Sequence, residues 1–196
     1  MLHIIGLNHR AQAQQSGAEE TTEQRTFTGC LQSVIQEVGP VFIAEEDSEE
    51  ALAERQETSI SKRIADDKGI EHRFRDPTRA QRDELHYRDG QTIEVQMHMR
   101  CEPLSDEEIH LKSRAIELGN YFPIRERLWF DRLGGCRERD AIFICGDAHI
   151  GTFTSLLDRE RVPHRIVERG IGVTAEERED FRRISEYLKN HPELIK

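Results

Sequence analysis

The chain has 196 residues, of which 36% are hydrophobic and 34% charged, and a formal net charge of −10. This length suits one domain with a substantial core, and the negative charge argues against nucleic acid as the main partner, because phosphate binding requires a basic face. No stretch approaches the ~18 apolar residues of a membrane span and no signal peptide precedes the first polar segment, so we expect a cytoplasmic protein without membrane contact.

Apolar runs bounded by turn residues predict strands of a parallel sheet in the first half of the chain. The first run, residues 2–5, leads into Gly6-Leu7-Asn8-His9. Polar residues 10–23 indicate a loop leading into a helix, and an apolar stripe ended by Gly39-Pro40 predicts that helix over residues 22–38. We expect the next elements to be a strand at 41–44, a helix over 45–65 and a strand at 70–74.

The second half begins with its most ambiguous segment, residues 86–100. Alternation over 92–97, beside the turn signal Asp89-Gly90, favours a strand or hairpin arm there. A helical pattern then covers residues 105–133, with a break expected at Pro123. The remaining predicted elements are a strand at 141–145, a helix over 150–159, a strand at 164–167 and a helix over 174–189.

Strands that alternate with helices predict an α/β fold. We expect a mainly parallel central sheet with helices on both faces, and a possible antiparallel hairpin insertion around 86–100. The chain is expected to form a single domain over residues 1–196.

Polar side chains follow four predicted strands, at the edge where the carboxyl ends of parallel strands meet. They are His9, the pair Glu45 and Glu46, Asp76, and His149, which ends Gly146-Asp147-Ala148-His149. Histidines and carboxylates can bind a divalent metal or act as metal-free general acids and bases. Each residue alone is more often part of a loop, a turn or a helix start than of a site, so their convergence carries the prediction. Alternation places Glu45 and Glu46 on opposite faces, so only one can face this site if the strand continues through both.

Together these motifs resemble the TraB/Tiki (GumN, PrgY) superfamily, which is related to the erythromycin esterase and ChaN group. The family carries two Gly-x-x-His motifs, which end here at His9 and His149, and a strand ending in glutamate, for which Glu45 is a better match than Glu46. Arg82 resembles the arginine downstream of the strand that leads to Asp76. Arg125 resembles the arginine of the family's Arg-Asn helix, where Glu126 replaces the asparagine in this chain. The resemblance implies an EreA/ChaN-like fold and a TraB/Tiki-like domain.

The resemblance and the residues together favour a peptidase-like or esterase-like hydrolase. His9, Glu45 and His149 would hold a divalent metal (Mn, Co or Zn), or Glu45 would act as general base on a water molecule. Arg125 and Arg82 would orient an anionic group or stabilise oxyanion charge, and Asp76 completes the candidate catalytic set.

We expect a small-molecule or peptide substrate and no nucleic-acid or membrane partner, and a homodimer is possible. Two other functions stay open at this point. One is a ligand-binding or sensing protein that uses the same pocket without turnover, and the other is an interaction partner within a multi-gene system.

Overall fold

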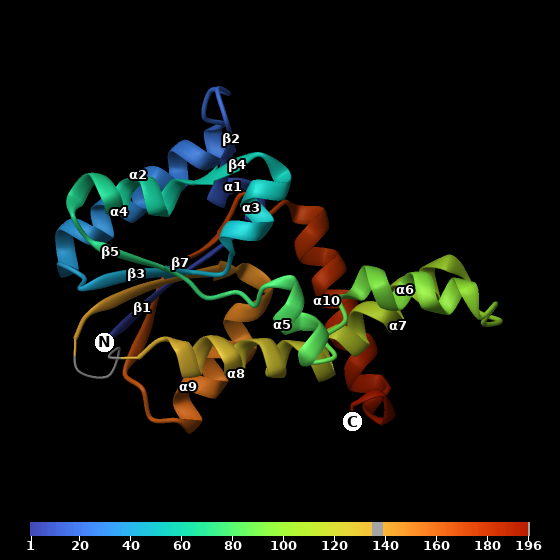
Figure 1. The fold of residues 1–196 in the computed structure, drawn as a ribbon. Helices are drawn as coiled ribbons and strands as arrows, with labels where there is room; N and C mark the ends of the chain where they lie inside the picture. The colour runs from blue at the N-terminus through green and yellow to red at the C-terminus, as the bar shows by residue number, and fades with distance from the viewer. Residues whose placement is uncertain (135–138, 196) are drawn as a thin grey trace. The chain divides into compact units, whose positions relative to one another are not determined.

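The computed structural model describes residues 1–134 and 139–195. Its contacts divide the chain into two compact units, residues 1–78 with 127–173, and residues 79–126 with 174–196. The first unit contains a five-stranded parallel sheet in the order β5-β3-β6-β1-β7 (Figure 1). The α/β prediction with a mainly parallel sheet is therefore confirmed, whereas a single-domain organisation stays a prediction.

The strands and helices of the first unit alternate along the chain. The sheet consists of β1 (Leu2–Leu7), β3 (Phe42–Glu45), β5 (Glu71–Phe74), β6 (Ala141–Gly146) and β7 (His164–Ile171). A separate antiparallel pair is formed by β2 (Ala13–Gln15) and β4 (Glu57–Ser59). The helices are α1 (His9–Gln12), α2 (Thr22–Val38), α3 (Glu49–Arg55), α4 (Ile60–Lys68), the 3-10 turn η2 (Asp147–His149) and α9 (Ile150–Arg159).

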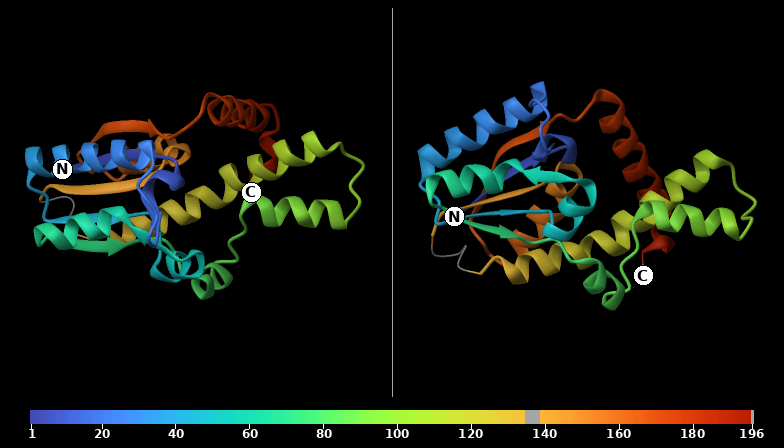
Figure 2. Two further views of the ribbon diagram at one scale, coloured as in Figure 1. Left: turned by 90° about the horizontal axis from the view of Figure 1, so that it is seen from above. Right: turned by 45° about the horizontal axis from the view of Figure 1, so that its top comes forward.

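The three central strands, β1, β3 and β6, are buried on both faces of the sheet. Successive residues of each strand point to opposite sides. Figures 1 and 2 show α2 and α4 over one face and α9 over the other. The residues that face α2 and α4 include Ile5, Leu7, Ile43, Ile142 and Ile144. Those that face α9 and Trp129 of α8 (Phe122–Arg132) include Ile4, Phe42, Ala44, Phe143 and Cys145.

The register of the two central strands aligns their carboxyl ends. In the parallel β1–β6 pair, Gly6 lies opposite Cys145 and Leu7 opposite Gly146. The two Gly-x-x-His segments therefore leave the sheet only one residue out of step, side by side. This register brings two motifs that lie 140 positions apart in the sequence to one edge of the sheet.

The second unit is helical. Its elements are α5 (Arg79–Glu84), α6 (Gly90–Met99), α7 (Asp106–Ile116), the π-helical turn η1 (Glu117–Tyr121), the first part of α8, α10 (Ala175–Asn190) and η3 (Pro192–Leu194). A small core of Ile93, Met97 and Ile109 joins α6 to α7. Throughout residues 1–134 and 139–195, every helix falls short of the length and apolarity that crossing a bilayer requires.

The hairpin predicted around 86–100 is wrong, because α6 is a helix. Asp89 caps its start by accepting a hydrogen bond from the backbone of Thr92 at 2.7 Å. Ile93 and Met97, one helical turn apart, are buried, whereas Val95 between them is 52% exposed. The helical period is therefore the one that burial selects, and the apparent alternation of apolar residues over 92–97 had no structural meaning.

Two other segments differ from their predicted structure. The helix expected over 45–65 is interrupted, because Gln56 ends α3 in the left-handed conformation with φ 57° and β4 follows. The loop expected over 10–23 contains α1 and β2, and β2 pairs with β4. The break expected at Pro123 coincides with a change of helix type, because the π-helical turn η1 separates α7 from α8 immediately before Pro123.

Gly90 offers a test of packing in the second unit. A Cβ there would lie 2.6 Å from Cδ of Arg114 and 2.6 Å from Oε2 of Glu117. Burial already raises the pKa of the Glu117 carboxyl, which Arg114 and the Gly90 N–H partly offset. We expect Gly90→Ala to destabilise the protein by about 1 kcal/mol in chemical denaturation, the low end of the overpacking range, because the atoms that must shift belong to flexible side chains. The matched control is Gly29→Ala on α2, where a Cβ meets nothing within 4 Å and where alanine should stabilise. Equal effects of the two substitutions would contradict this packing.

Candidate functional site

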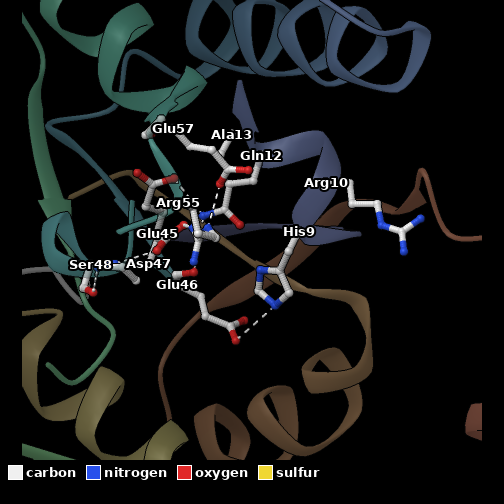
Figure 3. A network of polar contacts seen from close by, with 12 residues as sticks. His9, Arg10, Gln12, Ala13, Glu45, Glu46, Asp47, Ser48, Arg55 and Glu57 are labelled. Carbon is white, nitrogen blue, oxygen red and sulfur yellow. Dashed lines mark hydrogen bonds and ion pairs between the residues drawn. The ribbon is translucent and has the colours of Figure 1, made fainter. Parts of the chain in front are cut away.

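Three side chains meet at the carboxyl ends of β1, β3 and β6. Nε2 of His9 and Nε2 of His149 each lie 3.5 Å from the same oxygen, Oε1 of Glu46. Figure 3 shows the His9 ring turned toward the Glu46 carboxylate. We refer to these three residues as the histidine–glutamate cluster. All three belong to the first unit.

The members of the cluster differ sharply in exposure. The Glu46 side chain is 0% exposed and the His149 side chain 4%, whereas the His9 side chain is 56% exposed. At 3.5 Å the two contacts with Glu46 are longer than a tight hydrogen bond. The cluster therefore has one imidazole that water can reach and one that is enclosed, with a buried carboxylate between them.

Local structure fixes each member of the cluster. Asn8 caps α1 by accepting a hydrogen bond from the Arg10 backbone at 3.0 Å, so that the helix starts at His9. The backbone N–H of Glu46 donates to Ile144 of β6 at 2.8 Å, which carries the pairing of β3 with β6 one residue beyond the end of β3. His149 ends η2, the 3-10 turn that follows β6.

Gly146 lies at the centre of the cluster. Its backbone N–H donates to Oε2 of Glu46 at 2.7 Å, which leaves Oε1 for the two histidines. A Cβ at this position would lie 3.1 Å from Nε2 of His9, 3.4 Å from Oε2 of Glu46 and 3.7 Å from Cδ2 of His149. With φ −57° and ψ 137°, its backbone conformation is open to any residue. Glycine is favoured here because the side chains of the cluster occupy the space that a Cβ would take, and not because the backbone conformation requires it.

His149 is held from behind by an aromatic contact. The Trp129 ring packs edge-on against the His149 ring, with centroids 4.8 Å apart. Nε1 of Trp129 in turn donates to Oδ1 of Asp76 at 3.3 Å. Asp76, predicted as a catalytic residue, is thus buried and connected to the cluster through Trp129. The hydrogen bond from Trp129 suits Asp76 to a supporting role, in which it holds the Trp129 ring that packs against His149.

Glu45 lies on the other side of the strand from Glu46, as alternation requires. Its Oε1 is 2.9 Å from Nε2 of His72, and its Oε2 accepts a hydrogen bond from Gln12 at 2.8 Å. Glu45 was the predicted ligand and general base, but the structure places Glu46 between the two Gly-x-x-His histidines. Glu45 and His72 form a second, separate buried pair.

Asp47 continues this run of buried acids with a partner of its own. It pairs with Arg55 at 2.8 Å, and its carboxylate also accepts a hydrogen bond from the Ser48 backbone at 2.8 Å. Burial raises the pKa of the Asp47 carboxyl, while the Ser48 hydrogen bond and Arg55 oppose that rise. The three consecutive acids at the end of β3 therefore have three different sets of basic partners, which allows them to be buried together.

Arg82 and Arg125 both belong to the second unit, whereas the cluster belongs to the first. Their guanidinium groups lie 5.6 Å and 5.9 Å from the centroid of the Tyr87 ring. Such distances are typical of cation–π contacts. The structure thus gathers the two predicted arginines at one tyrosine, and their predicted role at the substrate stays a prediction.

The predicted metal site requires a separate test. Within residues 1–134 and 139–195, no group of three or more histidine, cysteine, aspartate or glutamate side chains is arranged to hold a metal ion. The predicted third ligand, Glu45, is engaged by His72 and Gln12. Because the donors as arranged do not fit a metal, we derive no chemical step through one.

Several residues of the site were not singled out from the sequence. Trp129 lies in a helix expected only to carry Arg125, and Gln12 lies in a segment read as a loop. His72 was not among the candidate residues, although it lies opposite Ile43 in the β3–β5 register and so on the same face as Glu45. Strand alternation was the one signal that could have paired His72 with Glu45 beforehand.

No protein-family model, curated protein or solved structure matches this chain.

Proposed function

We propose that this protein is a hydrolase of esters, amides or peptides in which His9 is the general base and the cluster is its catalytic centre. One observation carries the proposal: a single buried carboxylate oxygen lies 3.5 Å from Nε2 of both an exposed and a buried histidine. A carboxylate beside an imidazole fixes its orientation and stabilises the imidazolium form. The resemblance to the TraB/Tiki superfamily supports the same class of activity.

The proposed reaction begins with a water molecule next to His9. His9 takes a proton from the water as the oxygen adds to the substrate carbonyl carbon, and Glu46 stabilises the imidazolium that forms. When the tetrahedral intermediate collapses, His9 returns the proton to the leaving alcohol or amine. His149 holds Glu46 from its enclosed side. The two Nε2–Oε1 contacts are expected to shorten when substrate excludes water, as catalytic hydrogen bonds commonly do.

The decisive variant is His9→Asn, because His9 is largely exposed and its removal should leave the fold intact. We expect hydrolysis of a panel of p-nitrophenyl esters, amides and peptides to fall by about 100-fold or more, the usual contribution of a general base. The matched control is His98→Asn on α6, an exposed histidine of the second unit that lies outside the cluster. Unchanged turnover in His9→Asn would contradict the proposal that His9 is the general base.

The same assay separates the proposal from the alternatives drawn from the sequence. It is run after EDTA treatment and again with Mn²⁺, Co²⁺ or Zn²⁺ added, because a divalent metal was predicted. Turnover that requires one of these ions would favour the metal-assisted hydrolase. A wild-type protein that hydrolyses nothing in the panel under either condition would favour a binding or sensing function. A cytoplasmic location and a small-molecule or peptide substrate remain part of the proposal.

A further inference from the structure

Asp147, inside the second Gly-x-x-His motif, receives three hydrogen bonds from the end of β7. Nε of Arg169 donates to Oδ1 at 3.2 Å, a second guanidinium nitrogen of Arg169 donates to Oδ2 at 3.0 Å, and the Gly170 backbone N–H donates to Oδ1 at 2.9 Å. Arg169 therefore grips both oxygens of the carboxylate. Bidentate arginine–carboxylate pairs are among the strongest and most directional polar contacts in proteins.

Space for this carboxylate is provided by β1. A Cβ at Gly6 would lie 2.8 Å from Oδ1 of Asp147 and 2.9 Å from Cγ1 of Ile150. The glycines of the two Gly-x-x-His motifs thus have parallel uses. Gly6 makes room for Asp147 on the β7 side, and Gly146 makes room for the cluster on the β3 side.

Asp147 is also the first residue of η2, two positions before His149. Its backbone carbonyl accepts a hydrogen bond from Ile150, the residue directly after His149. η2 is therefore fixed by its own backbone and by the anchored Asp147 side chain. Asp147 and His149 belong to the same three-residue turn. A rotation of this turn would therefore move the His149 ring away from Glu46.

We propose that Asp147 and Arg169 are positioning residues, which anchor η2 to β7 and so hold His149 against Glu46. The Asp147 side chain is 16% exposed and Arg169 is 56% exposed. Because the Arg169 side chain is more than half exposed, solvent screens this ion pair, and we expect its effect to be local rather than global. The kinetic consequence rests on the proposed function, whereas the position of His149 does not.

The first test compares Asp147→Asn, Arg169→Met and the double variant in the hydrolase assay. We expect each single variant to lower kcat by about tenfold with little change in KM, because the misplaced group acts on the transition state. The double variant should be no worse than the poorer single variant, since both remove one interaction. The matched control is Asp140→Asn, a carboxylate at the opposite end of β6 that contacts His3 at 2.9 Å, and it should leave kcat unchanged.

The second test observes His149 directly by imidazole NMR, with its signals among the nine histidines assigned by their loss in His149→Gln. Asp147→Asn and Arg169→Met should shift or broaden the His149 signals, and Asp140→Asn should not. Signals of His149 that match the wild type in both single variants would overturn the inference, whatever the kinetics. If His9→Asn keeps full turnover, the proposed function fails, but a shifted His149 signal would still establish the positioning role.

Discussion

Glu46→Gln should abolish most of the hydrolase activity and leave the fold in place. The glutamine keeps an oxygen that can accept the Gly146 N–H, which donates to Glu46 at 2.7 Å. It carries no charge, however, and so cannot stabilise the imidazolium of His9 or His149. We expect kcat to fall by about 100-fold to 10,000-fold, as when general-base catalysis is lost. The measurement is a steady-state assay on purified variants with melting curves recorded in parallel.

Glu45→Gln is the matched control, because its carboxylate is just as buried and only one residue away. Glu45 bridges His72 and Gln12, both of which direct nitrogen atoms at its oxygens. A glutamine can present only one oxygen to these two nitrogens, so we expect a loss of about 1–3 kcal/mol in stability with turnover retained. If Glu45→Gln is inactive while Glu46→Gln is active, the glutamate chosen from the family motif was the right one and the cluster described above is not the catalytic centre.

The sequence predicted that Glu45 and Glu46 lie on opposite faces of the sheet, but not which of them lies beside the two histidines. Alternation correctly places them on opposite faces, since Ile43 faces α2 and α4 while Ala44 faces α9. Which of those faces carries the two histidines depends on how α1 and η2 leave the sheet. That depends on the Asn8 cap and on the β1–β6 register, neither of which has a periodic signal. The family motif favoured Glu45, which ends β3, whereas in the structure its neighbour Glu46 contacts the two histidines.

Strands and long helices were predictable because burial imposes a period on many residues at once. The helix predicted over 22–38 coincides with α2, and the strand predicted at 141–145 is β6 without its last residue. By contrast, β2 and β4 are three residues each and exist through their pairing with one another. Contacts between segments more than forty positions apart leave no local trace in composition. The same limit explains why Gln12, which holds Glu45, was hidden in an apparent loop.

Gly146→Ala tests the cluster by adding one methyl group at its centre. The new Cβ would lie 3.1 Å from Nε2 of His9, a distance that forces one of the two groups to shift. His9 is the group that can yield, because its side chain is 56% exposed, whereas Glu46 and His149 are enclosed. We expect the ring to move away from Glu46 by a few tenths of an ångström and kcat to fall by about tenfold, less than the roughly 100-fold cost of a 1 Å misplacement.

The backbone at Gly146 is not strained by alanine, so a general loss of folding is not expected. Gly151→Ala, five residues along the chain on α9, is the control, since a Cβ there meets nothing within 4 Å. It should keep full turnover and gain up to about 1 kcal/mol in stability. Full activity in Gly146→Ala would mean that His9 works without contact to Glu46. That result would contradict the proposal that Glu46 supports His9 as the general base. Inactivity in both alanine variants would instead point to the turn around η2 as a whole, and not to the space between His9 and Glu46.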